Sequence, residues 1–237
     1  MPPRLALVIA ESALERVPAE IQNHPEIIRY AKRRGKKPGE VLLDRSYHHS
    51  AMMRLKNAER RGRPDIVHFS LLEALGSPLN KGGLLDLYVH TFDDCILSVD
   101  RVVRLPKNYN RFVGLMEDLL ELGRVPPEGE VLITAKRGSL KSLISELHPT
   151  TVLVLTSGGR LARLDGVMEE ASKAPRLAVI IGGFPRGEFS EDILKLADRL
   201  VAISPEPLEA WTVVSRVIYE YERAVGLSET KLETHSQ

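Results

Sequence analysis

The apolar residues form their clearest pattern between Thr151 and Pro207. Three short runs rich in Val, Ile and Leu lie in TVLVLTSGGR, LAVIIGGFPRG and RLVAISPEP. Runs of this length without polar alternation are typical of strands buried on both faces of a parallel sheet. The two intervening segments, Leu161–Ala171 and Ser190–Leu200, have apolar residues at helical spacing. The pattern therefore predicts a β-α-β-α-β series.

Each of these three strands runs into a segment that contains Gly or Pro: Leu155–Arg160, Gly182–Gly187 and Ala202–Pro207. Ligands bind outside the carboxyl ends of parallel strands, so three such loops in succession favour a small-molecule pocket over simple turns. The glycines match neither GxGxxG nor GxxxxGK[ST], so the sequence does not support a dinucleotide or nucleoside-triphosphate site of those kinds.

The remaining periodicity predicts further strands and helices on both sides of this series. Val41–Leu43 is too short to assign alone, although it is compatible with a strand that ends at Asp44. The predicted strands are Leu5–Ala10, Asp65–Phe69, Leu84–Thr91, Cys95–Val99 and Val131–Ala135. The predicted helices are His24–Arg34, Tyr47–Arg61, a short one that ends at Leu75, Phe112–Leu122, Leu140–Leu147 with Ser139 as its cap, and Leu208–Val225.

The charge distribution is uneven, although the net charge is only +1. From Pro25 to Arg63 there are 12 Lys/Arg against 4 Asp/Glu, and from Glu188 to Gln237 there are 5 against 10. Such asymmetry suggests that one face binds a polyanion, the alternative being a solvated helical surface. The segment RVVRLPKNYNR, Arg101–Arg111, is expected to be a loop that presents cations without burying them.

Composition excludes several classes of protein. No apolar run approaches the roughly 20 residues that a membrane span requires, and the first residues lack the pattern of a signal peptide. One cysteine, Cys95, excludes a disulfide framework and fits a reducing cytoplasm; we expect it to be a small core residue. His48 and His49 have no accompanying Cys/His set, so no metal site is predicted.

Several longer motifs resemble one known family over nearly the whole chain. They are LLDRSYHHSAM from Leu42, GRPDIVHFSLLEALGSPLN from Gly62, VHTFDD from Val89, RLPKNYNRFVGLMEDLL from Arg104, IGGFPRG from Ile181 and AISPEPLEAW from Ala202. The stretch RPDIVHFSLLEALGSPLN is the most specific. The sequence thus resembles the pseudouridine methyltransferases of ribosome biogenesis, the essential-for-mitotic-growth (Nep) family of the SPOUT superfamily, in an archaeal form.

The resemblance implies an α/β fold with a mostly parallel sheet, flanking helices and a C-terminal trefoil knot, an exception to the rule that connections do not thread. A single domain would comprise an RNA-facing half (1–130), a knotted cofactor-binding half (131–226) and a frayed tail (227–237). The family is homodimeric, which gives the last helix and Trp211 an interface role beside a core role. The resemblance implies that S-adenosylmethionine is bound by Leu155, Gly182, Gly187, Glu188, Phe189, Ala202, Ile203, Ser204, Pro205, Glu206 and Pro207.

The implied reaction is methylation of ring nitrogen 1 of a pseudouridine in small-subunit ribosomal RNA. This nitrogen carries the sugar in uridine, but in pseudouridine it has a free N–H. The resemblance assigns Arg63, Asp65, Arg104, Lys107 and Arg111 to RNA binding. Lys107 stands where arginine is common, which keeps the charge but loses the bidentate fork for phosphate. Asp65 is the candidate base; alternatively it orients the target or pairs with Arg63.

Two aromatic residues of the cationic segment, Tyr109 and Phe112, could stack on a base, although packing is the commoner role. Two other functions also fit the sequence. The protein could be an RNA-binding assembly factor whose structural role dominates, or a knotted methyltransferase that acts on transfer RNA.

Overall fold

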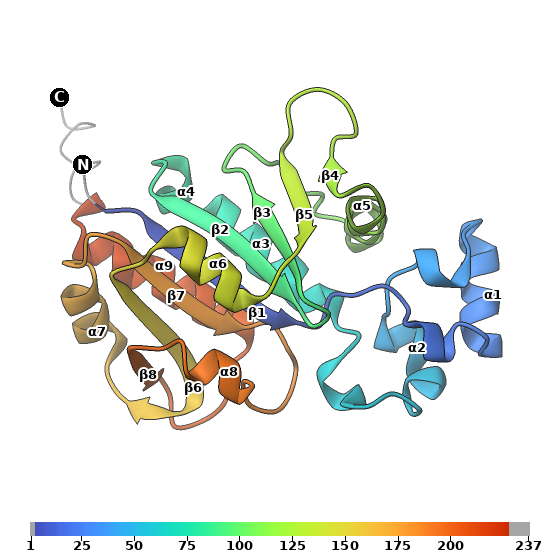
Figure 1. Cartoon of the computed structure of the whole chain (residues 1–237). Helices are drawn as coiled ribbons and strands as arrows, with labels where there is room; N and C mark the ends of the chain where they lie inside the picture. The colour runs from blue at the N-terminus through green and yellow to red at the C-terminus, as the bar shows by residue number, and fades with distance from the viewer. Residues whose placement is uncertain (1–2, 228–237) are drawn as a thin grey trace.

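The computed structural model describes residues 3–227, and an eight-stranded sheet runs through it in the order β4-β5-β3-β2-β1-β7-β6-β8 (Figure 1). Strands β2, β1, β7, β6 and β8 are mutually parallel, and β3, β5 and β4 extend the sheet in antiparallel fashion. The strands are β1 (Leu5–Ser12), β2 (Leu85–Thr91), β3 (Cys95–Val99), β4 (Arg124–Val125), β5 (Ile133–Arg137), β6 (Thr151–Leu161), β7 (Leu177–Gly182) and β8 (Arg199–Ala202).

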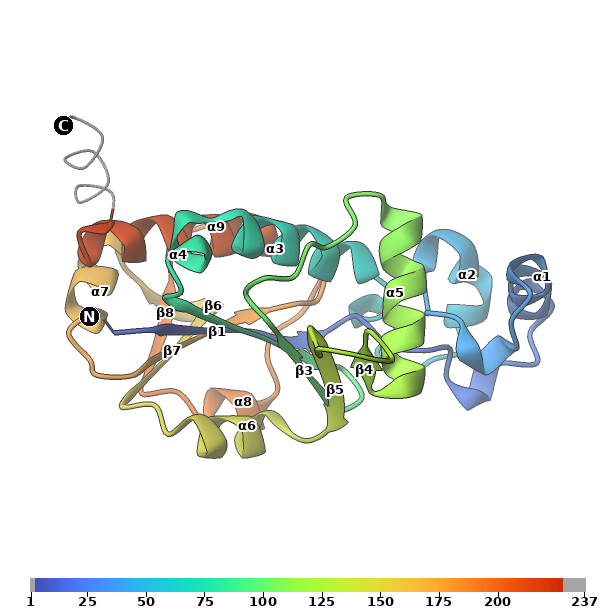
Figure 2. The ribbon, with the colours of Figure 1, turned by 90° about the horizontal axis from the view of Figure 1, so that it is seen from above.

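Helices cover both faces of this sheet. Figure 2 shows α3, α4 and α9 on one face and α6 and α8 on the other, while α1 and α2 project beyond the end of the sheet next to α5. The α-helices are α1 (Pro25–Arg34), α2 (Arg45–Met52), α3 (Pro64–Gly76), α4 (Pro78–Lys81), α5 (Tyr109–Leu122), α6 (Leu140–Leu147), α7 (Leu164–Ala171), α8 (Glu191–Leu194) and α9 (Ala210–Ala224). Three 3₁₀ turns are η1 (Ala19–Ile21), η2 (Pro38–Glu40) and η3 (Ala58–Arg60).

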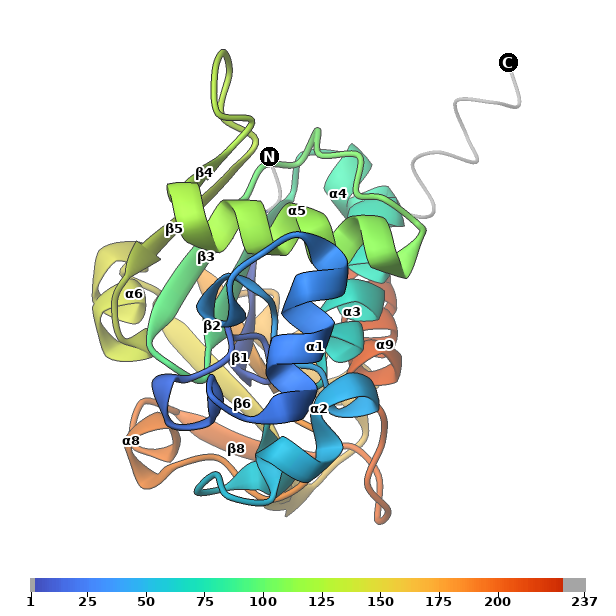
Figure 3. The ribbon, with the colours of Figure 1, turned by 90° about the vertical axis from the view of Figure 1, so that its right-hand side faces the viewer.

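The central strand β1 supplies both cores because its side chains alternate between the two faces. Leu7 and Ile9 join the cluster that contains residues of α3 and α9, whereas Val8 and Ala10 join the cluster under α6 and α8. A third cluster lies within the projecting part and contains Ile27 of α1 and residues of α2. Figure 3 shows α1 and α2 side by side in this part. The cation-rich residues 25–63, called the basic segment below, thus have a small hydrophobic core of their own.

Most of the predicted elements are present. The parallel β-α-β-α-β series, the β2–β3 hairpin and the helix Leu140–Leu147 are confirmed, and the Ser139 side chain accepts from the Ser142 N–H as its cap. Strand β6 is longer than predicted, since it continues through Leu155–Arg160 and pairs with β8 on both sides of an irregularity. The segment Ser190–Leu200 forms only the short helix α8.

The prediction for Asp65–Phe69 was wrong, because this segment lies in helix α3 and not in a strand. Pro64 at the first helical position favours a helix start, and α3 buries residues on most of its circumference. A helix that is apolar nearly all round shows a continuous apolar run, which periodicity cannot distinguish from a buried strand.

One further prediction in the basic segment (residues 25–63) was wrong, and one open assignment there is settled. Val41–Leu43, which was too short to assign from the sequence, is not a strand: only an isolated bridge joins Leu42 to Arg16. The helix predicted over Tyr47–Arg61 is α2, which ends at Met52 and is followed by turns and η3. Asn57, with φ +55°, is in the left-handed region and breaks the helical path.

The predicted frayed tail, apart from Leu227, lies outside the described residues. Within residues 3–227, no helix combines the length and the apolar character needed to cross a bilayer.

Candidate functional site

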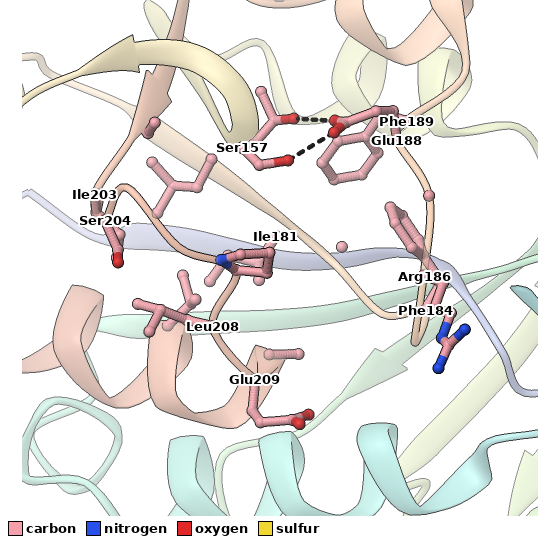
Figure 4. Close-up of a pocket in the computed structure, with 18 of the residues that line it drawn as sticks. Ser157, Ile181, Phe184, Arg186, Glu188, Phe189, Ile203, Ser204, Leu208 and Glu209 are labelled. Carbon is pink, nitrogen blue, oxygen red and sulfur yellow. Dashed lines mark hydrogen bonds between the residues drawn. The ribbon is translucent and has the colours of Figure 1, made fainter.

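A cavity of about 490 Å³ opens between β6 and the loops that follow β7 and β8. Helix α3 contributes Ile66 to its wall, and α9 contributes Ala210 and Val213. Figure 4 shows that residues from segments far apart in the sequence face this space. Its size is in the range of sites for small molecules and cofactors.

Ten of the eleven residues that the sequence assigned to the cofactor line this cavity, and Pro205 does not. The ten are Leu155, Gly182, Gly187, Glu188, Phe189, Ala202, Ile203, Ser204, Glu206 and Pro207. The structure therefore brings together the three segments predicted to follow the apolar runs, although Leu155–Arg160 belongs to β6 and is not a loop.

Glu188 is the acidic group whose position in this cavity is most firmly defined. Its carboxylate accepts hydrogen bonds from the hydroxyls of Ser157 (2.6 Å) and Thr156 (2.8 Å), which belong to β6 (Figure 4). These two hydrogen bonds, aided by the charge of Arg60, lower the pKa of Glu188. The carboxylate is thus ionised at neutral pH and suits hydroxyl or ammonium donors of a ligand.

Another part of the wall is apolar. The rings of Phe184 and Phe189 meet edge to face with centroids 5.2 Å apart, and Leu155, Ile181 and Val201 add aliphatic surface. A cavity that combines such an apolar part with fixed polar groups is suited to a flat heteroaromatic ring whose polar edge bonds to the backbone.

The predicted target-binding pair lies next to this cavity, at the start of α3. Arg63 is the N-cap residue, and its guanidinium donates to both carboxylate oxygens of Asp65, with Nε–Oδ1 at 2.8 Å and Nη2–Oδ2 at 2.7 Å. Of the alternatives for Asp65, the ion pair with Arg63 is therefore present. Both side chains remain partly exposed, at 34% and 27%, so the pair can still contact a ligand.

This pair lines a second, more open cavity of about 520 Å³. Its lining consists of Arg45, Ser46, Arg63, Asp65, Phe69 and Tyr109. Because Ile66 reaches the first cavity while Asp65 and Phe69 reach the second, the first two turns of α3 lie between the two cavities.

Tyr109 and Phe112, the two aromatic candidates of the cationic segment, take different places. Phe112 is fully buried, so packing is its role. Tyr109 donates its hydroxyl to Asp44 Oδ2 at 2.6 Å, and burial together with this hydrogen bond raises the pKa of Tyr109. Its ring forms part of the second cavity as a neutral phenol.

The cations predicted to be exposed are exposed: Arg104 and Lys107 lie in the loop before α5, but Arg111 lies in the first turn of α5, which begins at Tyr109 and so shortens the predicted loop. Among the described residues, none forms a hydrogen bond or ion pair with the charged groups of Arg104, Lys107 or Arg111. The loop is anchored at Pro106, whose carbonyl accepts from His68 Nε2 at 2.7 Å. Unpaired cations on an anchored loop are available to phosphate groups.

The remaining candidates contribute no chemistry to either cavity. Cys95 is buried at the start of β3, and burial raises the pKa of its thiol. His48 is buried, and its Nδ1 accepts from the Asp44 N–H at 3.1 Å. In residues 3–227 no group of three or more His, Cys, Asp or Glu side chains is arranged to hold a metal.

Comparison with known proteins defines the family. The sequence model described as EMG1/NEP1 methyltransferase matches residues 7–222. The chain belongs to this family. Its relatives include the "Ribosomal RNA small subunit methyltransferase Nep1" of Thermococcus kodakarensis, which is 46% identical over 94% of this chain and 100% of its own length. The protein of the same name from Pyrobaculum calidifontis is 47% identical, again over 94% of this chain and 100% of its own length.

A solved structure of the family has the same fold. Archaeoglobus fulgidus Nep1, bound to S-adenosylhomocysteine, is similar to this chain with a TM-score of 0.82 and 40% identity, over 94% of this chain and 99% of that one. This likeness over most of the chain agrees with the α/β fold that the sequence motifs imply.

Several residues that line the first cavity were not identified from the sequence. Thr156, Ser157, Phe184 and Arg186 lie inside or beside the predicted loops, so the loop pattern signals them indirectly. Ile66 and Val213 come from helices outside the β-α-β-α-β series, and no local sequence signal identifies them.

Proposed function

We propose that this protein is an S-adenosylmethionine-dependent methyltransferase that modifies small-subunit ribosomal RNA, in ribosome biogenesis. The observation that carries the proposal is the position of α3 between a cofactor-sized cavity and an arginine-bearing surface. The small-subunit methyltransferases named above and the S-adenosylhomocysteine-bound structure of a 40% identical relative support it.

In this proposal the first cavity holds the cofactor, which supplies an activated methyl group on a sulfonium. The apolar wall around Phe189 accommodates the adenine, and Glu188 accepts from hydroxyl or ammonium groups of the ligand. The residues of this chain act by holding the donor rigidly, since positioning supplies much of the acceleration of a transfer from an activated donor.

We further propose that the acceptor is ring nitrogen 1 of a pseudouridine. The nitrogen–carbon bond forms as the sulfur–carbon bond breaks, the electron pair of that bond stays on sulfur, and the N1 proton leaves to a base or to water. The target nucleotide has to be unpaired or flipped out to reach the cofactor. Because both oxygens of Asp65 are engaged by Arg63, the geometry favours an orienting role for Asp65 over that of the base.

The specificity is tested with two stem-loop RNAs that differ only in one nucleoside, pseudouridine or uridine. We expect methylation of the pseudouridine RNA, detected by mass spectrometry, and no product from the uridine RNA. Equal rates on both RNAs would refute the specificity. Absence of S-adenosylhomocysteine binding in calorimetry would refute the cofactor assignment as well.

We also propose that the C-terminal strands form a trefoil knot and that the protein is a homodimer that uses α9. Exposed aromatic residues at this helix support the dimer: Tyr219 is 56% exposed, and Phe69, which is 45% exposed, meets Trp211 edge to face at 5.2 Å. Sedimentation at micromolar concentration should give twice the mass of the chain, 26.4 kDa, and a monomer would contradict the proposal.

A further inference from the structure

We propose that Arg60, in the basic segment, is a positioning residue for the cofactor-binding loop 183–190. The inference rests on the proposed function of the first cavity, although Arg60 itself does not line it. Arg60 belongs to η3, which is separated from this loop by more than 120 residues of sequence. Its contacts connect three segments: the end of β1, η3 and the loop between β7 and α8.

The first contact is an ion pair with the end of β1. Arg60 Nη2 donates to Glu11 Oε2 at 2.6 Å, and the two side chains are only 15% and 13% exposed. The same carboxylate accepts from the backbone N–H of Ser190 (3.2 Å to Oε2), where the loop ends and α8 begins. Glu11 thus connects Arg60 to the end of the loop at Ser190.

The second contact is with the middle of the loop. The guanidinium carbon of Arg60 lies 4.1 Å from the centre of the Phe184 ring, close enough for a cation–π interaction. The alkyl part of Arg60 faces Gly187, where a Cβ would lie 3.6 Å from Cδ. Gly187 has φ +91°, a conformation that other residues rarely adopt, so the path of the loop at this point is sharply defined.

The cavity depends on the residues that these contacts fix. Phe184, Gly187, Glu188 and Phe189 all line it, and Phe184 meets Phe189 edge to face. The Nε of Arg60 is buried and has no hydrogen-bond partner among the described residues. The contacts of the guanidinium with Glu11 and Phe184 therefore offset the free-energy cost of burying it. Removing the Arg60 side chain therefore removes the contact with Phe184 and also the ion pair with Glu11, the residue that accepts from Ser190 at the end of the loop.

Local backbone strain supports the same reading. Glu11 has φ +48°, in the left-handed region, which is uncommon for a residue other than glycine. Its N–H donates to His90 Nδ1 at 3.3 Å, and this bond helps to hold the turn. Strain of this kind persists only where the surroundings fix it, and here it directs the carboxylate toward Arg60 and Ser190.

The test measures binding of S-adenosylhomocysteine to the full chain by calorimetry, with thermal unfolding recorded for each variant. Arg60→Ala should weaken binding about tenfold, the equivalent of about 1.4 kcal/mol. Arg60→Lys keeps a cation for Glu11 but loses the planar stack on Phe184, so its affinity should be intermediate. The control Arg54→Ala removes an exposed cation of the same basic segment and should bind like the wild type.

A second pair of variants separates positioning from general stability. Glu11→Gln should also weaken cofactor binding, but it should add little in an Arg60→Ala background, because both changes break the same connection. Additive effects of the two changes, or equal affinities for Arg60→Ala and Arg54→Ala, would overturn the inference. If Arg60→Ala does not fold, an unchanged affinity in Glu11→Gln overturns it instead. A wild-type protein that does not bind S-adenosylhomocysteine would refute the proposed function, and the inference with it.

Discussion

Gly159 lies where β6 approaches β8 most closely, and its replacement by alanine gives a sharp test of the cavity's architecture. Gly159 lies in the irregular part of β6, between Leu155 and Arg160, both of which pair with Val201. A Cβ at this position would lie 2.6 Å from the backbone N and C of Val201 and 2.7 Å from the backbone C of Leu200. Backbone atoms in a paired strand cannot move aside as a flexible side chain can.

The magnitude follows from the distance that β8 would have to move. An ordinary carbon contact begins near 3.4 Å, so the 2.6 Å approach requires a shift of about 0.8 Å. Overpacking of this kind costs about 1–3 kcal/mol. For a chain of this size each kcal/mol lowers the melting temperature by about 2–4 °C, so we expect Gly159→Ala to melt about 2–12 °C lower.

The neighbouring glycine provides a matched control. At Gly158 the nearest atom to a Cβ is Glu188 Oε2 at 3.8 Å, an ordinary contact, and neither glycine has positive φ. Gly158→Ala should therefore melt within about 1 °C of the wild type or slightly higher. Because β8 leads directly into the loop whose residues Ile203, Ser204 and Glu206 line the first cavity, Gly159→Ala should also bind S-adenosylhomocysteine less tightly than Gly158→Ala does. Equal melting temperatures and affinities for the two variants would refute this reasoning.

Three other predictions concern the RNA surface, the ion pair and pH. Arg104→Ala should weaken binding of the stem-loop RNA and reduce the slope of log K against log salt by about 0.7, and an unchanged slope would count against a phosphate contact. Asp65→Asn should lower kcat on the pseudouridine RNA while leaving S-adenosylhomocysteine affinity unchanged, because Asp65 lines the second cavity and not the first. Burial lowers the pKa of His48 to about 4 from 6.5, so the folded state binds fewer protons than the unfolded state. The stability present above pH 6.5 should then fall by about 3 kcal/mol as the pH drops to 4, and urea titrations should show a smaller loss in His48→Gln.

The apolar runs between Thr151 and Pro207 were enough to predict the segments that line the first cavity. Parallel strands have their carboxyl ends at the same edge of a sheet, so the segments that follow successive strands lie close together in space. Pro205, which does not reach the cavity, shows the limit of that reasoning. The path of a loop decides which of its successive residues face inward, and the pattern of apolar runs does not specify that path.

The secondary structure of the basic segment was predicted less well, for a different physical reason. Its turns between Met52 and Gly62 are held by contacts distant in the sequence, such as the pair of Arg61 with Glu15 at 2.5 Å. Local periodicity over Tyr47–Arg61 favours a helix, but tertiary contacts and the left-handed Asn57 override it.

The wrong prediction for Asp65–Phe69 shows why the site depends on helical geometry. In a strand, Asp65, Val67 and Phe69 would share one face and Ile66 would lie on the other. In α3, Asp65 and Phe69 are four residues apart and lie on the same side, where both line the second cavity, while Val67 turns into the core. Ile66 is rotated by about 100° from Asp65 and reaches the first cavity instead. The period of 3.6 residues thus lets one short segment supply the core and both cavities, so that Asp65 lines the second cavity one residue before Ile66 lines the first.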